Sequence, residues 1–214
     1  MWLLVTYRRP DMLARLKRQM AMTCSTDVAN VAVHDNTPDN IGLIAGLNKL
    51  LSLYPNERWY GLLADDLIPE TENWDAELLA NLPSGGMVSC NDGGAPWITG
   101  RMCGACVIDG DAVRSAGFIG PPPCWHSFTD DFWEDCAAEG MPWTRLKDVV
   151  VRHDTPVGNY RPPDETHFKA YGKNYEILED DRAKYNAWMA TEGRNAKRRV
   201  IDNAKASWWK HAVA

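Results

Sequence analysis

The sequence lacks any apolar run long enough to cross a bilayer, and its first apolar stretch, residues 2–6, is shorter than the apolar core of a signal peptide. It also lacks internal repeats and low-complexity tracts, so the chain is not an array of small repeated units. These absences predict a protein that stays in the cytoplasm of the cell that makes it, or of the host cell if the chain is viral.

Cysteine is scarce for a disulfide framework, with six residues in a chain of 214. In a reducing cytoplasm, free thiols are favoured over disulfides. Cys103 and Cys106 have a spacing that occurs in zinc sites, but residues three apart in the strand expected at 101–108 point to opposite faces. The pattern therefore favours buried thiols over a zinc site.

The composition, with 45% hydrophobic and 24% charged residues, fits one globular domain with an adequate core. The formal charge of −6 is unevenly spread. Residues 193–214 hold six Lys or Arg against one Asp, a local charge of +5, so the preceding residues carry −11. This asymmetry singles out the C-terminal segment as a candidate contact for an anionic partner.

The first half of the chain reads as strands that alternate with helices. Apolar runs at 2–6, 28–33 and 59–64 predict buried strands, and helices are expected from Pro10 onward and over 40–51. This alternation predicts a doubly wound half-sheet of parallel strands. In such sheets, ligands bind in the crevice beyond the carboxyl ends of the strands.

Polar residues stand just beyond each of these three strands. Arg8 follows the first, Asp35 the second, and Asp65 with Asp66 the third. Two adjacent carboxylates at a strand end can hold a hard divalent cation, which in turn can hold a diphosphate. Each position also has an ordinary alternative: a solvated basic turn, a turn-forming Asp, and solvated acids at a strand end. Further along, Thr71 is expected to cap the next helix.

The second half of the chain adds two more candidate positions. Thr129 is expected to cap a short helix that has Asp130 and Asp131 in its first turn. Such acids are ordinary partners of the helix dipole, but a carboxylate kept ionised there can also act as a general base. His153 follows a strand expected at 143–151. It is either a hydrogen-bonded structural residue or the nitrogen ligand of a site for Mn²⁺ or a similar ion.

Together these elements resemble a glycosyltransferase of the GT-A fold, family 2 type, in a compact form such as those of phages and bacteria. The resemblance spans about residues 2–155 and keeps the order of the family's motifs. Val5–Pro10 resembles the turn that lines the nucleotide pocket, Asp35 the acid that meets the uracil or ribose, and Asn40-x-Gly42 the Asn-x-Gly of the next helix. The donor-binding residues that this resemblance implies are Thr6, Tyr7, Arg8, Asp35, Asn40 and Asp65.

The adjacent acids Asp65 and Asp66 resemble the family's metal-binding Asp-x-Asp region, from which they differ by having no residue between them. The resemblance implies that Asp66, together with Asp65 and the late His153, binds Mn²⁺ or Mg²⁺. Asp130 and Asp131 look like the family's acceptor-side acid before a helix, so one of them is the implied base of an inverting transfer.

The sequence thus predicts an α/β fold of GT-A type, with a Rossmann-like, mostly parallel sheet flanked by helices and a helical C-terminal extension. We expect a catalytic domain over residues 1–156, and over 157–214 an irregular segment and a basic helical extension that pack on the same domain. The expected activity is metal-dependent transfer of a sugar from a nucleotide-sugar, first of all a UDP-sugar, to an acceptor hydroxyl.

Two rival functions fit parts of the pattern. A sugar-nucleotide nucleotidyltransferase shares the fold but normally opens with a glycine-rich phosphate loop, and Val5–Pro10 contains no glycine. A non-catalytic nucleotide-sugar-binding module would keep the fold without turnover, but acids at three separate strand ends argue against it.

The basic C-terminal segment bears on the acceptor. Residues 194–210 can form a helix with Val200, Ala204 and Trp208 on one stripe and basic residues beside it. It is either a docked terminal helix with a solvated basic face, or a membrane-surface helix that brings the enzyme to a glycan or lipid-linked acceptor. In a third interpretation, it contacts DNA phosphates and the acceptor is a hydroxymethylated base flipped out of the stack. We favour DNA over a membrane acceptor because the chain is compact and has no anchor.

Overall fold

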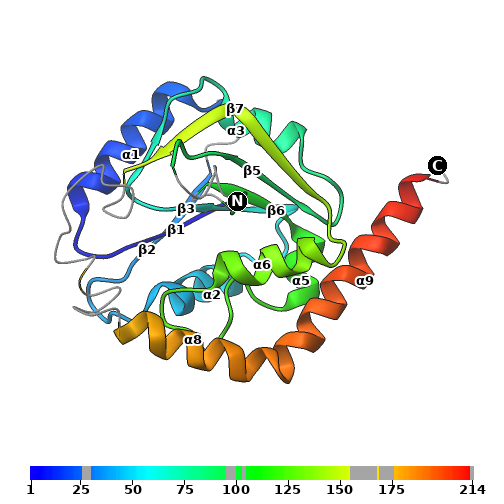
Figure 1. Cartoon of the computed structure of the whole chain (residues 1–214). Coiled ribbons are helices and arrows are strands. Elements are labelled where there is room, and N and C mark those ends of the chain that lie inside the picture. Colours follow the sequence, from blue (N-terminus) through cyan, green and yellow to red (C-terminus); the bar gives the residue numbers. More distant parts are fainter. Residues whose placement is uncertain (26–29, 95–99, 103–104, 155–167, 169–175, 213–214) are drawn as a thin grey trace.

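The computed structural model describes residues 1–25, 30–94, 100–102, 105–154, 168 and 176–212, with side chains described up to Trp208. A central sheet lies between two layers of helices (Figure 1). Within the described residues the sheet has seven strands, in the order β2-β1-β3-β6-β5-β7-β4. These strands are β1 (Trp2–Thr6), β2 (Val31–Asp35), β3 (Trp59–Leu63), β4 (Leu67–Pro69), β5 (Met87–Asn91), β6 (Cys106–Asp109) and β7 (Trp143–His153).

The strand directions make this a mixed sheet. β1 pairs in parallel with both β2 and β3, and β7 pairs in parallel with β5. β6 runs antiparallel to both of its neighbours, and the short β4 runs antiparallel to the end of β7. The predicted α/β architecture is therefore present, with a parallel half built from the first three long strands and β6 inserted in the opposite direction.

The helices cover both faces of the sheet. α1 and α3 pack on one face, and the other helices pack on the opposite face (Figure 1). Their bounds are α1 (Pro10–Thr23), α2 (Leu43–Leu53), α3 (Trp74–Ala80), α5 (Gly110–Ala116), α6 (Thr129–Ala138), α8 (Glu176–Met189) and α9 (Glu192–Ala212). Within the described ranges, none of these helices is both long enough and apolar enough to span a membrane.

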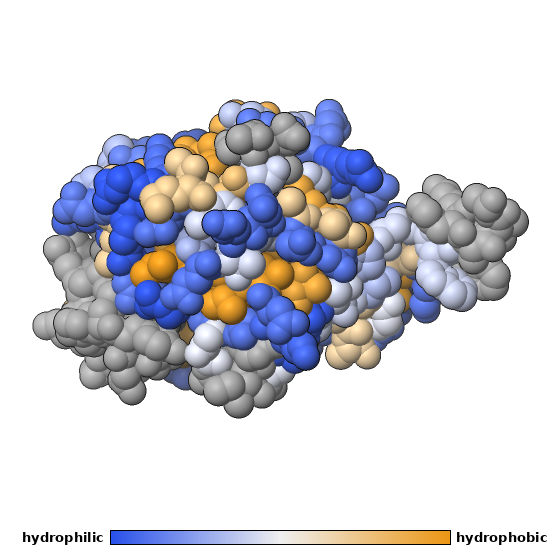
Figure 2. All heavy atoms as spheres, turned by 90° about the horizontal axis from the view of Figure 1, so that it is seen from above, coloured by the Kyte–Doolittle hydropathy of each residue, from blue (hydrophilic) through white to orange (hydrophobic). Residues whose placement is uncertain are grey.

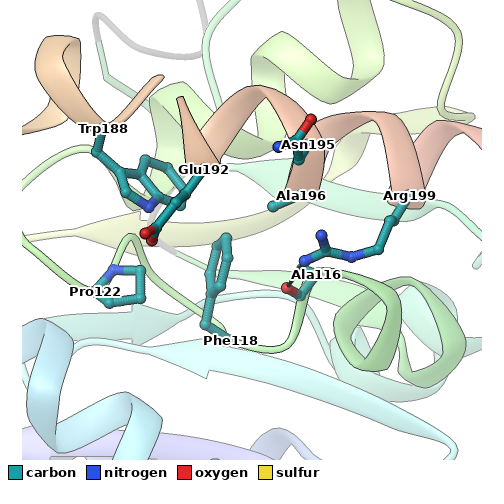
Figure 3. Close-up of a pocket in the computed structure, with 8 residues that line it drawn as sticks. All are labelled: Ala116, Phe118, Pro122, Trp188, Glu192, Asn195, Ala196 and Arg199. Atoms are coloured by element: carbon teal, nitrogen blue, oxygen red, sulfur yellow. Dashed lines mark hydrogen bonds between the residues drawn. The ribbon is translucent and has the colours of Figure 1, made fainter. Parts of the chain in front are cut away.

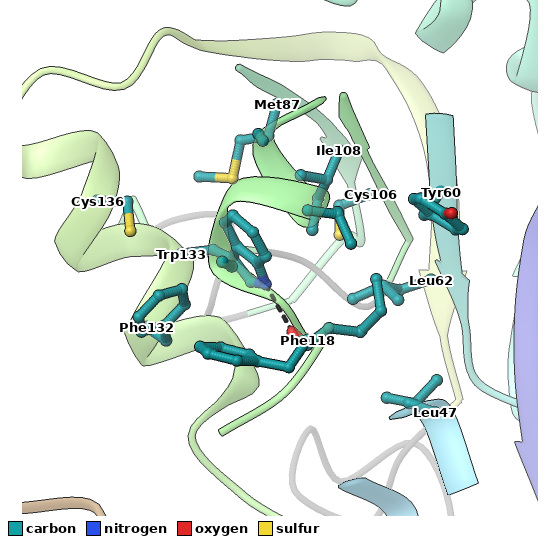
Figure 4. Close-up of a cluster of buried hydrophobic side chains, with 14 of the residues drawn as sticks. Leu47, Tyr60, Leu62, Met87, Cys106, Ile108, Phe118, Phe132, Trp133 and Cys136 are labelled. Carbon is teal, nitrogen blue, oxygen red and sulfur yellow. Dashed lines mark hydrogen bonds between the residues drawn. The ribbon is translucent and has the colours of Figure 1, made fainter. Parts of the chain in front are cut away.

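Large aromatic side chains fill the core on both faces. Under α1 and α3, Trp2 packs against Trp74 with ring centroids 4.9 Å apart. A Cβ on Gly61 would lie 2.0 Å from the Trp2 ring, so β3 requires glycine where it passes this side chain. On the other face, Trp133 of α6 is fully buried, and its indole N–H donates to the Ile119 carbonyl at 2.8 Å (Figure 4). Burial of these rings contributes much of the favourable free energy of folding.

Two predicted helix caps are wrong. The Thr71 hydroxyl accepts a hydrogen bond from the Val150 N–H at 2.8 Å and ties the chain to β7, while α3 begins only at Trp74. Thr129 is the first residue of α6, and the capping position belongs to Phe128, which has a φ of 76° and makes no side-chain cap. In both cases a hydroxyl residue marked the region of a helix start but did not cap the helix.

Other boundaries shifted by a few residues. The second strand, expected at 28–33, spans Val31–Asp35, and residues 26–29 lie outside the described ranges. The strand expected at 101–108 is described only as Cys106–Asp109. The described cysteines are free thiols, four of them buried, as the composition predicted; Cys103 lies outside the described residues. The expected domain boundary after residue 156 also lies outside them and stays a prediction.

The C-terminal helix agrees with the sequence in part. Val200 and Ala204 are buried, as their stripe predicted, and they belong to the same apolar core as Tyr185 of α8. Trp208, which was placed on that stripe, is 62% exposed. The far end of α9 stands clear of the globular body (Figures 1 and 2), which leaves the Trp208 side chain largely exposed.

Candidate functional site

A charged cluster lies at the carboxyl ends of β1 and β3. Asp65 and Asp66 lie one residue beyond the end of β3 and are almost fully buried. The Thr6 hydroxyl at the end of β1 donates to Asp65 Oδ2 at 2.7 Å. One nitrogen of Arg9, Nη1, lies 3.0 Å from Asp65 Oδ1 and 3.3 Å from Asp66 Oδ2. His153 Nε2 lies 3.0 Å from Asp66 Oδ1.

The topology explains why these residues meet. β1 and β3 are parallel neighbours, so their carboxyl ends open at the same edge of the sheet. After Asp66 the chain turns into β4, which pairs antiparallel with β7 and places Leu67 opposite His153. The Asp154 N–H then donates to the Asp66 carbonyl at 2.9 Å. The pairing of β4 with β7 therefore brings a histidine from late in the chain next to the acids of β3.

The environment of the two acids is unusual for carboxylates. Burial raises the pKa of Asp65, and the neighbouring charge of Asp66 raises it further, whereas Arg9 and the Thr6 hydrogen bond act to lower it. The Arg9 side chain is only 13% exposed. Because one guanidinium contacts both carboxylates, it offsets the repulsion between two acids that the fold has withdrawn from water.

The residues fit a divalent cation through Asp66 and His153. Ligands at right angles on an octahedral cation with bonds of about 2.1 Å lie about 3.0 Å apart. The separation of Asp66 Oδ1 and His153 Nε2 is 3.0 Å, which also suits a direct hydrogen bond. Asp65 is a poorer ligand, since Thr6 and Arg9 occupy its two oxygens. In the part of the chain that the structure describes, no group of three or more His, Cys, Asp or Glu is arranged for a metal, so further ligands would come from a bound diphosphate and water.

A second acidic cluster stands at the start of α6. Arg101 Nη2 lies 3.0 Å from Asp131 Oδ1 and 3.5 Å from Asp130 Oδ2, and its Nε lies 2.6 Å from Glu134 Oε2. Burial and the adjacent charge of Asp131 raise the pKa of Asp130 to about 6, while Arg101 acts in the opposite direction. The Asp130 side chain is still 46% exposed, so it is open to a reactant.

The predicted donor-binding residues at the ends of β1 and β2 also come together. The Arg8 N–H donates to the Thr37 hydroxyl at 3.1 Å, and the Arg8 guanidinium lies over the Tyr7 ring, 5.4 Å from its centroid. Asp35 Oδ1 accepts the Thr37 N–H at 2.9 Å. Hydrogen bonds from Thr37, first from its side chain and then from this N–H, lower the pKa of Asp35. Asp35 is therefore a turn former, as its ordinary alternative predicted, but its side chain remains exposed to a ligand.

Asn40 belongs to the same rim and has a φ of 41°. Its side chain accepts from the Asn36 amide at 3.4 Å. Asn36 itself is buried, accepts the Ile41 N–H at 2.8 Å and donates its own N–H to the Thr6 carbonyl at 2.8 Å. It therefore fixes the turn that carries Asn40 relative to β1.

Three contributors to the site were absent from the predicted residues. Arg9 was part of the basic turn, but only the fold shows that it bridges Asp65 and Asp66. Asn36 stood next to Asp35 without a pattern of its own. Asp181 of α8 could not be identified from its neighbours in the sequence, because an Asp on a polar helix is expected to lie on the surface.

A separate groove of about 290 Å³ lies between the end of α5 and the junction of α8 with α9 (Figure 3). Phe118, Pro122 and Trp188 form its apolar wall. Arg199 lines the other side, where it donates to the Ser115 and Ala116 carbonyls and so caps α5. None of the predicted site residues lines this groove, so we place the chemistry at the strand ends.

The fold has counterparts among solved structures, although no protein-family model and no curated protein matches the sequence. The mannosyltransferase PcManGT from Pyrobaculum calidifontis, solved with GDP-Man and Mn²⁺, superposes with a TM-score of 0.59 at 15% identity over 100% of this chain and 74% of its own. The catalytic domain of Drosophila β1,4-galactosyltransferase 7, solved with xylobiose, gives 0.58 at 14% identity over 86% and 79%. These similarities confirm the predicted GT-A type of fold.

Proposed function

We propose that this chain is a nucleotide-sugar-dependent glycosyltransferase. The observation that carries the proposal is the meeting of Asp66 and His153 beside Asp65, at the carboxyl end of β3 in a GT-A fold. This is the edge of the sheet at which α/β folds bind nucleotides. The similar mannosyltransferase was solved with a nucleotide-sugar and Mn²⁺, so a nucleotide-sugar donor and a divalent cation are the first ligands to test.

At the donor side, Asp66 and His153 would hold Mn²⁺ or Mg²⁺, and Asp65 would act through Thr6 and Arg9 to keep the cluster in place. When bound, the cation supplies positive charge that neutralises the diphosphate of the leaving group. Asp35, which is exposed, and Tyr7, which is half-buried, lie at the neighbouring strand ends and would contact the base and ribose. Arg8 and Asn40 would line the same rim.

At the acceptor side, Asp130 or Asp131 would remove the proton from the acceptor hydroxyl. As the oxygen–carbon bond to the anomeric carbon forms, the bond to the diphosphate breaks, and the proton passes to the carboxylate. A pKa of about 6 leaves Asp130 ionised at neutral pH, and makes it a stronger base than an ordinary Asp. A direct displacement of this kind inverts the anomeric centre.

The acceptor has two candidates. Hydroxymethylated DNA is one candidate, because Arg194, Arg198 and Lys205 are exposed along α9, the helix that also carries the exposed Trp208. The same helix, however, uses Lys197 to pair with Glu139 and Arg199 to cap α5, so part of the basic charge serves the fold. A glycan or lipid-linked glycan is the second candidate, and its glycan part is supported by the Drosophila enzyme, which was solved with xylobiose.

The direct test is hydrolysis and transfer with a panel of UDP- and GDP-sugars in the presence of Mn²⁺ or Mg²⁺. Asp66→Ala should lose metal-dependent donor binding. Glu70→Gln, which removes an exposed carboxylate paired with Arg152 beside the same strands, is the matched control and should bind normally. Absence of both binding and turnover with every donor would contradict the proposal.

The same experiments separate the two rival functions. Release of pyrophosphate from a nucleoside triphosphate and a sugar phosphate would identify a nucleotidyltransferase. Metal-dependent donor binding without hydrolysis or transfer would identify a binding module. The cytoplasmic location expected from the sequence stays a prediction, which fractionation of the producing cell would test.

A further inference from the structure

A buried carboxylate in the C-terminal extension holds the segment that leads to the acidic pair of α6. Asp181 of α8 is fully buried. Its Oδ1 accepts the Trp125 N–H at 2.6 Å, and its Oδ2 accepts the His126 and Ser127 N–H groups at 2.8 and 2.9 Å. Three successive backbone donors that converge on one carboxylate form an anion-binding nest, here filled by the protein's own side chain.

This contact lies directly before the start of α6. Phe128 follows the nest with a φ of 76°, and the helix begins at the next residue, so Asp130 stands three residues beyond Ser127. One helical turn after Asp181, Tyr185 stacks on Phe128 with ring centroids 4.9 Å apart. Two contacts from one face of α8 therefore fix the position and direction of the first turn of α6.

The Trp125–Ser127 turn also contacts the donor side of the site. The Trp125 carbonyl accepts the Ile44 N–H of α2 at 3.2 Å. A Cβ on Gly42 would lie 2.7 Å from that carbonyl and 2.8 Å from the Trp125 ring, so α2 approaches the turn as closely as a backbone can. The Trp125 ring is still 37% exposed. The turn thus lies between the loop that carries Asn40 and the helix that carries Asp130.

Burying a carboxylate is costly unless hydrogen bonds replace its water, and the three backbone donors do so here. On a solvated turn, water would satisfy these N–H groups without a charge in the core. What the buried carboxylate adds is a single geometry for the turn, because it must accept all three donors at once.

We propose that Asp181 is a positioning residue that sets the acceptor side of the site by locking the Trp125–Ser127 turn and, through it, Asp130 and Asp131. This inference rests on the proposed glycosyl transfer. It also assigns a role to the C-terminal extension: α8 is part of the frame of the active site, while the metal-side cluster of Asp66 and His153 is built without it.

The test compares Asp181→Asn with Asp180→Asn. Asp180 is the neighbouring exposed acid, which pairs with Lys184 at 2.6 Å, so its variant has the same charge change without the nest. Amide hydrogen exchange of residues 124–128 should accelerate at least tenfold in Asp181→Asn and stay unchanged in Asp180→Asn. The kcat for transfer to acceptor should fall at least tenfold in Asp181→Asn, while Mn²⁺-dependent donor binding stays within twofold of the wild type.

A second variant keeps the test decisive if Asp181→Asn does not fold. Asp181→Glu retains the charge but moves the carboxylate by one methylene, and it should restore part of the exchange protection and part of the transfer rate. Normal transfer in a folded variant whose turn exchanges rapidly would overturn the positioning role and leave the transferase function standing. Absence of transfer in the wild type with every donor and acceptor would overturn the proposed function itself.

Discussion

His153 Nε2 lies 3.0 Å from Asp66 Oδ1, although 87 residues separate them in the chain. The antiparallel pairing of β4 with β7 creates this contact, since Leu67 and His153 are register partners. The Asp66 side chain is 8% exposed and that of His153 is 27% exposed. A nitrogen and an oxygen at this spacing, next to a second carboxylate at a strand end, suit a cation that holds a diphosphate.

We predict that His153→Gln and Asp66→Asn each weaken Mn²⁺ binding. Loss of a residue that supports a metal ligand lowers metal affinity by up to about 100-fold. Loss of a direct ligand should therefore lower the affinity by about 100-fold or more. Titration calorimetry with Mn²⁺ in the presence of a nucleoside diphosphate measures the effect. Glu70→Gln is the control with the same change of charge as Asp66→Asn and should bind as the wild type does. Unchanged affinity in both site variants would place the cation elsewhere.

Arg9 gives a prediction about stability that does not depend on catalysis. Arg9→Gln leaves Asp65 and Asp66 buried without their shared guanidinium, and removal of one partner from such a group costs about 3 kcal/mol. Because Mn²⁺ can then replace the lost charge, added Mn²⁺ should raise the melting temperature of Arg9→Gln more than that of the wild type.

Arg15→Gln is the matched control for Arg9→Gln. Arg15 pairs with Asp154 at 2.8 Å close to the same cluster, but its side chain is 30% exposed, so its loss should cost less. Equal destabilisation by the two variants, or no difference in the response to Mn²⁺, would contradict the bridging role of Arg9.

The pH dependence of transfer should report Asp130. A base must be ionised, and the pKa of Asp130 is raised to about 6, so kcat/KM should fall about tenfold per pH unit below pH 6. Asp131→Asn removes a negative charge that raises this pKa, so the acid limb should move to lower pH. Arg101→Gln removes a positive charge that lowers it, so the limb should move to higher pH.

Asp130 also makes the stability of the folded protein depend on pH. An ion-paired acid with a lowered pKa makes a protein more stable as the pH rises, and Asp130 should do the opposite. Its pKa in the folded state lies above the ordinary value of 3.8, so the folded protein binds the proton more tightly and loses stability as the pH rises from about 4 to about 6. Asp130→Asn should therefore abolish transfer without lowering the melting temperature at pH 7. A large drop in that temperature would assign Asp130 a structural role instead.

The strand ends were predictable from the sequence because apolar runs stop abruptly where a buried strand leaves the sheet. The run 59–64 placed Asp65 and Asp66 at the correct edge, and the end of β1 placed Thr6 beside them. Strand direction was not predictable in the same way: a buried run has the same composition whichever way it points, so the antiparallel β6 could not be foreseen.

Contacts made by tertiary docking were equally beyond the sequence. Asp181 has polar neighbours on a helix of mixed charge, and only the docking of α8 on the Trp125–Ser127 turn buries it. Trp208 shows the opposite case. It was expected on an apolar stripe, but α9 extends beyond the globular body and leaves this side chain exposed. Periodicity shows which face of a helix is apolar, but it does not show how far the neighbouring elements extend.

The acceptor is the subject of the last prediction. If α9 contacts DNA, replacement of Arg194, Arg198 and Lys205 by Gln should weaken DNA binding and reduce the slope of log affinity against log salt by about 2.7, because each phosphate contact contributes about 0.9. Replacement of Lys17, Arg18 and Lys147, which are exposed on α1 and β7, removes the same charge elsewhere and should leave both quantities near their wild-type values. A transfer assay then identifies the acceptor.

In this assay, labelled sugar is offered to hydroxymethylated DNA, plain DNA, xylobiose and anionic lipid extract. If xylobiose or lipid becomes labelled and hydroxymethylated DNA does not, the DNA acceptor is ruled out. The donor and the enzyme would then both have been shown to be active.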